Sequence, residues 1–453
     1  MEKQRILFIS DYGPSPLFAG GLVLRSQLRV LAENYLIDYV IISPHKEEYE
    51  IEVQKGSTVT IIGKPGEKMP YVKHSIIREI LGRSYHHLLV RSFVNRSIQQ
   101  LNQIIEKNKY EFVFVTLEGS QLPQIISKVN FQNTHIFLQY WDPDEWWASV
   151  HNFSNYAKNV MRKAYIEIEN NENIIRAIVP SEGMKSLLIN RSGRLAHKLQ
   201  VLYPPAPTID ITSRKIETYT KFREAYDIVI MFTGSFYADA EFNQLIQAVE
   251  SIQTTSLRKR IGIAAFGKID ESSTLPRSKN IYYGGRITPE EIFGIAKSVD
   301  FLFLPYPLNN EELARASFPS KLATYCNLDR NILVISPPNS SLSIFLKQNK
   351  LDQFLISTNS QLETLSVLES LLTNSQMKQD QLSSIKSVRD NYFNDDSFKK
   401  KMVLIFGLTS RHEDDENEVF IVLPANSLIG IVNETGRIIL KMTRHFRPFT
   451  NHF

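Results

Sequence analysis

The sequence is poor in cysteine and has no long apolar run. Its 453 residues include one cysteine, Cys326, which excludes an internal disulfide framework and favours a reducing compartment. No run of about 18 apolar residues occurs, so we expect no membrane-spanning helix. The first apolar run extends only from Ile6 to Ile9 and is followed by Asp11, unlike a signal peptide. These absences predict a cytoplasmic protein.

Several motifs that define common enzyme classes are also absent. Neither GxGxxG nor GxxxxGK[ST] occurs, so the sequence has no dinucleotide fingerprint and no P-loop. It has no cysteine and histidine spacing for zinc and no GxSxG nucleophile elbow. The net charge is only +4, and the basic residues alternate with apolar ones, so we do not expect a nucleic-acid binder.

The length and the order of the expected elements indicate two domains. A chain of 453 residues is too long for one compact core. In residues 1–204, short apolar runs alternate with amphipathic segments, as in a parallel sheet with covering helices. We predict strands at 5–10, 39–43, 58–63, 111–119, 134–141 and 174–181. Ser181 is expected to cap the next helix, and the prolines after residue 199 suit a linker.

The second half repeats the alternation. Thr288, Pro289 and Glu291 have the pattern of a helix start, with a cap, a proline in the first helical position and a capping box. Residues 386–411 are rich in helix signals, and the tail 412–453 has the pattern of a few strands whose role the sequence leaves open. Apolar runs within residues 205–385 predict strands at 227–235, 260–267, 280–285, 300–307 and 331–336.

A basic and apolar segment, residues 68–96, interrupts the first half. It holds six lysines and arginines, and Glu79 is its only carboxylate. Isoleucine, leucine and valine lie between the charges. Two interpretations stay open: a solvated helix that covers the sheet, or a surface that lies on an anionic membrane.

The sequence resembles glycosyltransferase family 4. FTGSFYADAEFNQLIQAV resembles the opening of that family's donor domain, GGRITPEEIFGIAKSVDFLFLPY its nucleotide-binding segment, and FPSKLATYCNLDRNILVIS its proline-serine-lysine helix. FAGGLVLRSQLRVLAE and SEGMKSLL are similar to its glycine-rich loop and a later segment. The resemblance covers residues 5–405. It implies an α/β protein of GT-B fold, with two Rossmann-like domains facing across a cleft and C-terminal helices that cross back to the N-terminal domain.

The resemblance implies that the second domain binds a nucleotide-sugar donor. Gly234 and Ser235 match the turn after its first strand. Pro319 would start a helix, and Ser320 and Lys321 would follow in its first turn. A helix N-terminus with a lysine is an anion site that suits a diphosphate, and we assign Lys321 a catalytic role.

Three further donor candidates lie near strand ends. Arg286 follows a Gly-Gly turn, where ligands bind in open α/β sheets. Glu311 and Glu312 lie in the loop before the proline-serine-lysine helix and are candidates to bind a sugar hydroxyl, although a solvated pair explains them equally well. Thr324 and Ala316 stand where the family usually has glutamates, which puts the usual donor contacts in doubt.

The stretch YWDPDEWW, residues 140–147, contains all three tryptophans. As a helix start it would have Asp142 as the cap, Pro143 in the first helical position and Glu145 three residues after the cap. The Asp-Pro-Asp sequence also has the shape of a metal-binding DxD motif. Metal sites of that kind belong to the GT-A class, so we expect no bound metal and no cofactor.

The first domain is expected to bind the acceptor. Asp142 stands where the family bears a polar acceptor-side residue, and we assign it a catalytic role. The aromatic rings of Tyr140 and Trp141 are predicted to stack on a sugar or touch a lipid carrier. Glu118, at a strand end, is a second polar candidate, and glycine in the first strand-to-helix loop would let the backbone approach a ligand, at Gly20 and Gly21.

The resemblance implies a retaining glycosyltransferase that moves a sugar from a nucleotide-sugar donor to a saccharide or lipid-linked acceptor. Cell-surface polysaccharide or lipopolysaccharide biosynthesis is the expected setting, at the cytoplasmic face of a membrane. Two alternatives stay open. One is a nucleotide-sugar epimerase of GT-B fold, and the other is a non-catalytic binding or scaffold protein, which would explain the missing glutamates.

Overall fold

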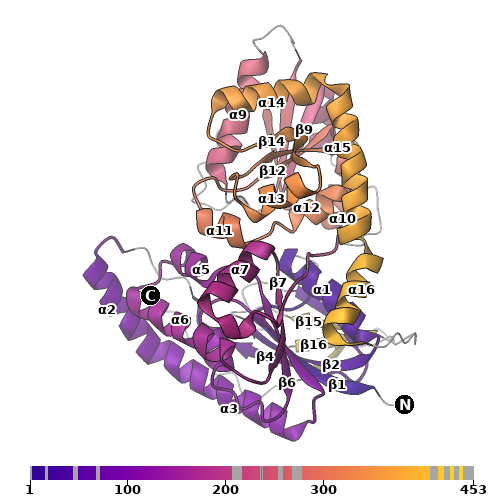
Figure 1. The fold of residues 1–453 in the computed structure, drawn as a ribbon. Coiled ribbons are helices and arrows are strands. Elements are labelled where there is room, and N and C mark those ends of the chain that lie inside the picture. Colours follow the sequence, from indigo (N-terminus) through magenta and orange to yellow (C-terminus); the bar gives the residue numbers. More distant parts are fainter. Residues whose placement is uncertain are drawn as a thin grey trace. The chain divides into compact units, whose positions relative to one another are not determined.

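The computed structural model describes most of the chain. The described residues are 3–15, 19–43, 49–67, 72–206, 217–234, 236, 238–253, 259–267, 278–408, 417–422, 429–432 and 438–441. The chain forms two compact units (Figure 1). Unit 1 comprises residues 1–180, 185–202 and 399–453, and unit 2 comprises residues 181–184 and 203–398.

Unit 1 is built on a seven-stranded parallel sheet in the order β4-β2-β1-β5-β6-β7-β8. Residues 6–10 of β1 and all of β5 are buried, as expected for a parallel sheet with both faces covered. The strands are β1 (Gln4–Ser10), β2 (Tyr35–Ser43), β4 (Val59–Gly63), β5 (Phe112–Leu117), β6 (His135–Tyr140), β7 (Ile174–Val179) and β8 (Leu199–Val201).

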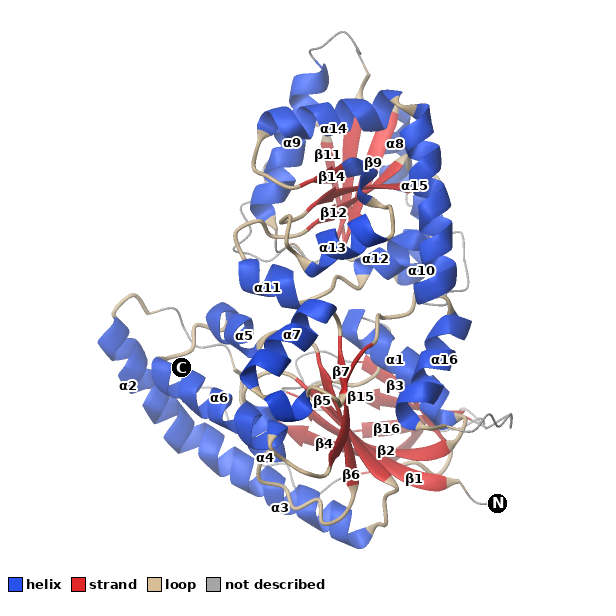
Figure 2. Ribbon diagram, in the orientation of Figure 1, coloured by secondary structure: helices blue, strands red, loops and turns tan. Residues whose placement is uncertain are grey.

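Helices cover both faces of this sheet (Figure 2). A long helical stretch runs from α2 through a π-helical turn at His86–Val90 into α3. Ser181 Oγ accepts a hydrogen bond from Met184 N at 2.9 Å, which confirms the expected cap of α7. The helices are α1 (Ala19–Ala32), α2 (Ser75–Tyr85), α3 (Arg91–Lys107), α4 (Gln121–Ile126), α5 (Asp144–Val150), α6 (Asn155–Glu169) and α7 (Glu182–Arg191).

The C-terminal part of the chain returns to unit 1, as expected. In α16 (Asp395–Phe406), the Phe406 ring stacks on Phe137 with 4.4 Å between centroids. Lys399 Nζ pairs with Glu33 at 2.6 Å. The change between units falls within α16, between Phe398 and Lys399, inside the helix-rich residues 386–411.

The described parts of the tail form strands. β15 (Asn417–Val422), β16 (Ile429–Val432) and β17 (Ile438–Lys441) are antiparallel, and β15 pairs with β3 (Tyr49–Gln54). The tail therefore contributes a small second sheet to unit 1, a placement that the sequence left open.

Unit 2 contains a six-stranded parallel sheet in the order β11-β10-β9-β12-β13-β14. Alternate side chains of β9 enter two different apolar clusters: Val229 and Met231 join one, and Ile228, Ile230 and Phe232 join the other. Both faces are therefore buried. The strands are β9 (Ile228–Thr233), β10 (Ile261–Phe266), β11 (Ile281–Gly285), β12 (Phe301–Pro305), β13 (Asn331–Ile335) and β14 (Leu355–Ile356).

Helices pack on both faces of the second sheet as well (Figure 2). Thr288 Oγ1 accepts from Glu291 N, and Glu291 Oε2 accepts from Thr288 N, so the predicted capping box is confirmed. The helices are α8 (Glu217–Glu224), α9 (Asp239–Gln253), α10 (Pro289–Ala296), α11 (Glu311–Ala316), α12 (Lys321–Cys326), α13 (Ser341–Gln348), α14 (Gln361–Thr373) and α15 (Ser375–Val388).

A buried tyrosine ties α12 to the sheet. The Tyr325 hydroxyl accepts from Thr233 N at 3.1 Å and donates to Phe303 O at 3.2 Å. Tyr325 is completely buried. Its hydroxyl therefore satisfies one backbone group at the end of β9 and one within β12.

Tyr325→Phe is expected to lower the free energy of unfolding by about 1–3 kcal/mol, because it leaves buried backbone groups unpaired. The change is measured by urea unfolding, with hydrogen exchange at the Thr233 amide as the local readout. Tyr140→Phe is the matched control, since the buried Tyr140 hydroxyl has no hydrogen-bond partner in the described part of the chain and its loss should cost nothing. Equal losses in the two variants would contradict the proposed role of Tyr325.

Candidate functional site

Glycines end three adjacent strands of unit 2. Gly234 follows β9, Gly267 follows β10 and Gly285 ends β11, all with positive φ. Gly234 N donates to Phe266 O at 2.8 Å, and Gly267 N donates to Gly285 O at 2.7 Å. A Cβ on Gly267 would lie 1.9 Å from the Gly234 carbonyl oxygen. Only glycine fits at position 267, because the Gly234 backbone approaches it so closely.

Lys321 lies across the first of these turns. A Cβ on Gly234 would be 2.3 Å from Lys321 Cε, and Lys321 Nζ is 5.0 Å from the centroid of the Phe232 ring. Burial lowers the pKa of Lys321 to about 7. An anion bound beside Nζ would favour the charged form and raise the pKa again. The structure thus brings together two predicted donor residues, Gly234 and Lys321. The predicted Ser235 lies outside the described residues.

The helix that carries Lys321, α12, starts later than predicted. α12 begins at Lys321 with Ser320 as its N-cap, so Pro319 is not the first helical residue. Leu322 N instead donates to Pro319 O, which makes a tight turn before the helix. Because α12 has only six residues, its dipole is a weak source of positive potential. Anion binding here would depend mainly on the Lys321 charge.

Ala316 and Thr324, which stand where the family usually has glutamates, differ in their surroundings. Ala316 is fully buried, and its carbonyl oxygen accepts a hydrogen bond from Ser181 Oγ. Thr324 is partly buried on α12. No carboxylate is available at either position for the donor contacts that family 4 implies.

The remaining donor candidates lie on other strand ends of unit 2. Arg286 is exposed directly after β11. Glu311 and Glu312 are not in a loop, as predicted, but in the first turn of α11, because the Asn310 side chain caps a separate short helix there. Glu311 Oε2 lies 3.9 Å from Arg315 Nη2 one turn later in the same helix, which gives Glu311 a structural explanation.

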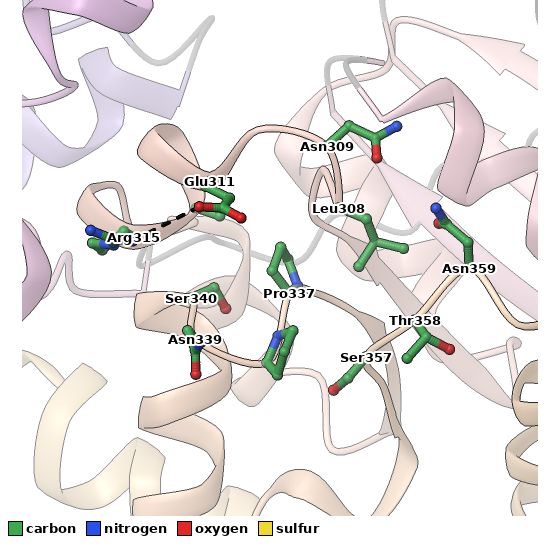
Figure 3. Close-up of a pocket in the computed structure, with 12 residues that line it drawn as sticks. Leu308, Asn309, Glu311, Arg315, Pro337, Asn339, Ser340, Ser357, Thr358 and Asn359 are labelled. Atoms are coloured by element: carbon green, nitrogen blue, oxygen red, sulfur yellow. Dashed lines mark ion pairs between the residues drawn. The ribbon is translucent and has the colours of Figure 1, made fainter.

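A cavity of about 290 Å³ lies among the loops that follow β12, β13 and β14 (Figure 3). Figure 3 shows Glu311 and Arg315 on α11 beside Pro337–Ser340 and Ser357–Asn359. Glu311 is the predicted donor residue that lines it. Lys321 and Gly234 do not line this cavity, so it lies at a different part of the sheet edge.

In unit 1, charged residues follow neighbouring strands. Lys64 follows β4, Asp11 follows β1 and Glu118 follows β5, while Asp142 lies shortly after β6. Lys64 Nζ is 2.8 Å from Asp11 Oδ2 and 3.1 Å from Glu67 Oε1, and all three side chains are buried. Sequence analysis had singled out Glu118 and Asp142 and missed Lys64, Asp11 and Glu67. The signal that would have found them is a charged residue just beyond a strand.

The surroundings give these carboxyl groups different pKa values. Burial, with the charges of Asp11 and Asp142, raises the pKa of Glu118 to about 8. Burial also raises the pKa of Asp11 to about 7, although Lys64 acts against it. Burial alone would raise the pKa of Glu67, but Lys64 and the Ser120 N–H hold it below its usual value. Glu67 is therefore the ionised partner of Lys64.

The segment YWDPDEWW contributes two contacts to this cluster. Trp147 Nε1 donates to Glu67 Oε2 at 3.1 Å, and its ring stacks on His151. The Trp141 ring lies beside Tyr12, with 6.4 Å between centroids. The tryptophans are thus explained in part by packing around the carboxylates.

The predicted helix start in this segment was wrong. α5 begins at Asp144 with Pro143, in an extended conformation, as its N-cap, so Asp142 does not cap the helix. Asp144 is buried and pairs with Arg191 Nη1 at 2.5 Å. That pairing fixes Asp144, and Asp142 remains near the carboxyl cluster, where its charge acts on Tyr12 and Glu118.

Two other acceptor predictions need correction. Tyr140 is 2% exposed and packs on Tyr165, so its ring has no face for a sugar. Gly20 and Gly21 lie in the first turn of α1 rather than in a loop. A Cβ on Gly20 would be 2.5 Å from the Tyr12 hydroxyl oxygen, so Gly20 makes room for Tyr12.

The described ranges contain no group of three or more His, Cys, Asp or Glu side chains that could hold a metal ion. Within the same ranges, every helix is too short or too polar to cross a membrane.

Solved structures share the architecture at low sequence identity. Anabaena HepE, solved with UDP and glucose, matches with a TM-score of 0.58 and 12% identity over 89% of this chain and 99% of that one. WaaG, a glycosyltransferase involved in lipopolysaccharide biosynthesis, matches with a TM-score of 0.53 and 11% identity, over 89% of this chain and 100% of that one. A Listeria monocytogenes protein described as a UDP-N-acetylglucosamine 2-epimerase matches with a TM-score of 0.53 and 11% identity, over 91% of this chain and 99% of that one. No protein-family model matches the sequence, and none of the curated proteins matches it.

The chain therefore has the GT-B fold that its sequence predicted. Identities of this size establish the fold alone, and membership of family 4 stays a prediction.

The low pKa of Lys321 predicts a pH-dependent stability. Its folded pKa of about 7 lies below the unfolded value of 10.5, so between these pH values the unfolded chain binds more protons. Stability should therefore rise with pH across this window. Urea unfolding of wild type and Lys321→Met at pH 7 and pH 9 measures the effect. Wild type should gain stability relative to the variant at pH 9, and a constant difference would contradict the buried, easily neutralised lysine.

Proposed function

We propose that the protein is a glycosyltransferase that uses a nucleotide-sugar donor. The observation that carries the proposal is the partly buried Lys321 above the Gly234 turn, in a chain of GT-B fold. HepE, which has the same fold, binds UDP and glucose in its crystal structure. We infer that residues 205–385 bind the donor and residues 1–204 bind the acceptor.

The chemistry follows from the leaving group. A departing nucleoside diphosphate gains negative charge, and Lys321 would stabilise that charge in a low-dielectric site. The resemblance implies retention of the anomeric configuration. In such a reaction the leaving diphosphate would take the proton of the acceptor hydroxyl as the new glycosidic bond forms. The proposal needs no bound metal, because Lys321 would supply the positive charge beside the diphosphate.

We further propose that α2, the π-helical turn and the start of α3 lie on an anionic membrane. Six large apolar side chains are exposed here, among them Ile76 at 74% and Leu88 at 75%. Arginines accompany them, and a groove of about 630 Å³ beside α6 is lined by Arg78, Arg83 and Tyr156. Apolar side chains with cations around them fit a headgroup region. Of the predicted segment, residues 68–71 lie outside the described residues.

This surface supports a lipid-linked acceptor and a role in cell-surface polysaccharide or lipopolysaccharide assembly, at the cytoplasmic face of a membrane. WaaG, of the same fold, acts in lipopolysaccharide biosynthesis.

An epimerase acting on a nucleotide sugar is the second candidate, because the Listeria protein shares the fold to a similar degree. The two functions differ in their products. An epimerase converts the donor alone into a different nucleotide sugar, whereas the transferase requires an acceptor to form a glycoside.

Thermal unfolding with UDP-, GDP-, ADP- and CMP-sugars tests the donor site. One nucleotide class should raise the midpoint by mass action, with or without EDTA. Loss of a charged hydrogen-bond donor costs about 1.5–3 kcal/mol, so Lys321→Met should weaken that ligand by roughly 10- to 100-fold.

Lys297→Met, at an exposed lysine of the same unit, is the matched control and should bind normally. A shift that depends on Mg²⁺ would contradict the metal-free site. The absence of a shift with every donor would contradict the proposed function.

Flotation with phosphatidylglycerol vesicles tests the membrane surface. Leu88→Ser and Arg78→Glu should each reduce vesicle binding several-fold. The first removes apolar area that the membrane would bury, and the second reverses a charge that would attract anionic lipid. Leu404→Ser is the matched control, since Leu404 is equally exposed, at 80%, but lies on α16. Binding that survives the first two changes, or that is as strong to neutral phosphatidylcholine, would show that this surface does not dock on anionic lipid.

A further inference from the structure

Two carboxyl groups of unit 1 each have an oxygen that the protein leaves unsatisfied. Asp11 Oδ1 and Glu118 Oε2 are both buried without a hydrogen-bond partner among the described residues, and Asp11 is only 6% exposed. A buried polar atom without a partner costs about 1–3 kcal/mol. Native structures retain few such atoms, and each requires an explanation. A ligand that supplies the missing hydrogen bonds is one.

The two groups lie at the ends of adjacent strands. Ile9 of β1 pairs with Val115 of β5, and Thr116 Oγ1 donates to Ser10 Oγ at 2.6 Å just beyond that pair. Asp11 follows Ser10, and Glu118 lies shortly after Thr116. The carboxyl edge of a parallel sheet is where ligands bind in open α/β folds.

The surrounding contacts hold both groups in place. Lys64 fixes Asp11 through Oδ2, and the Tyr12 hydroxyl hydrogen-bonds to Glu118. Lys64 is in turn held by Glu67, which also accepts hydrogen bonds from Ser120 N, Gln121 N and Trp147 Nε1. Gly119 has a φ of 67°, and a Cβ there would lie 2.6 Å from Glu67 Oε2. The unsatisfied oxygens thus belong to a rigid, built site.

Like charges and burial keep protons on the pair. With pKa values of about 7 for Asp11 and about 8 for Glu118, the pair holds one proton between these values and none at pH 9. The titratable groups that act on it are Lys64, Glu67, Tyr12, Asp142 and Tyr165.

We propose that Asp11 and Glu118 together bind one hydroxyl group of a sugar acceptor, which donates a hydrogen bond to one carboxyl and accepts one from the other. This inference rests on the proposed function and names the acceptor's chemical class. A hydroxyl both donates and accepts, and so matches a pair that shares one proton. The ring of Trp141 lies beside Tyr12, which hydrogen-bonds to Glu118, so we assign Trp141 the role of stacking on the sugar ring. A phosphate would be repelled by the surrounding carboxylates.

Saturation-transfer difference NMR with free sugars tests the pair. The probes are D-glucose, D-galactose, D-mannose and N-acetyl-D-glucosamine, at pH 7.5 and pH 9. The signal of at least one sugar should fall several-fold at pH 9, where the pair has lost its donor. Glu118→Gln should keep the signal at both pH values, because an amide donates and accepts without titrating. Asp11→Ala and Glu118→Ala should lose it.

Glu145→Gln is the control, since Glu145 is an exposed carboxylate of the same unit that pairs with Arg162. It should bind sugar as wild type does, with the same pH dependence. Circular dichroism establishes that each variant is folded, and Glu118→Gln is the conservative change. No sugar signal in wild type, a signal that ignores pH, or an unchanged signal in the folded Glu118→Ala protein would overturn the proposal. D-glucosamine is added as a fifth probe, and stronger binding of D-glucosamine than of D-glucose at pH 7.5 would overturn the proposal in favour of an ammonium site.

The donor titration separates the two proposals. If donors shift the midpoint but the sugar pattern fails, the carboxyl pair is wrong and the transferase proposal stands. If the sugar pattern holds and no donor binds, the pair binds sugar in a protein that is not a glycosyltransferase.

Discussion

Parallel strand pairing is the constraint on which both candidate sites depend. Because neighbouring strands run in the same direction, residues that are far apart in sequence arrive at one edge of each sheet. In unit 1 this brings Asp11 and Glu118 together although more than a hundred residues separate them along the chain. In unit 2 it brings together the turns at Gly234, Gly267 and Gly285. Each edge then acquires its character from the few residues just beyond the strands.

The two edges have opposite chemistry. In unit 2, Lys321 lies against the first of the close-packed glycine turns, and burial disfavours its charge. Such a group gains from a bound anion. In unit 1, carboxyl groups surround one lysine, Lys64, and two of their oxygens lack partners. An edge of that kind favours hydroxyl groups and excludes phosphate. The contrast between the edges supports a division of labour between donor and acceptor.

The departures from family 4 fit this division. Ala316 is buried and Thr324 is neutral, so the donor edge has no carboxylate at either position. Glu311 and Glu312 lie in the first turn of α11, at a different part of the chain from these two positions. Donor recognition would therefore rest on fewer polar contacts than the family pattern implies, and Lys321 would carry a larger share of the binding.

Local sequence patterns determined the elements and their order. The apolar runs predicted the strands of both parallel sheets except β8 and β14, the short edge strands. The signals at Thr288 and Ser181 predicted two helix starts, because caps act within one turn of chain. The starts predicted at Asp142 and Pro319 were wrong, since a neighbouring proline conformation and a tight turn moved each helix by one or two residues.

Only the tertiary structure decided which side chains meet. Neither the bond from Trp147 to Glu67 nor the pairing of Lys64 with Asp11 could be read from spacing, because each joins loops that follow different strands. The burial of Tyr140, the pairing of β15 with β3 and the lowered pKa of Lys321 likewise arise from neighbours distant in sequence. Sequence determines short-range geometry, whereas burial and charge proximity depend on how the sheets assemble.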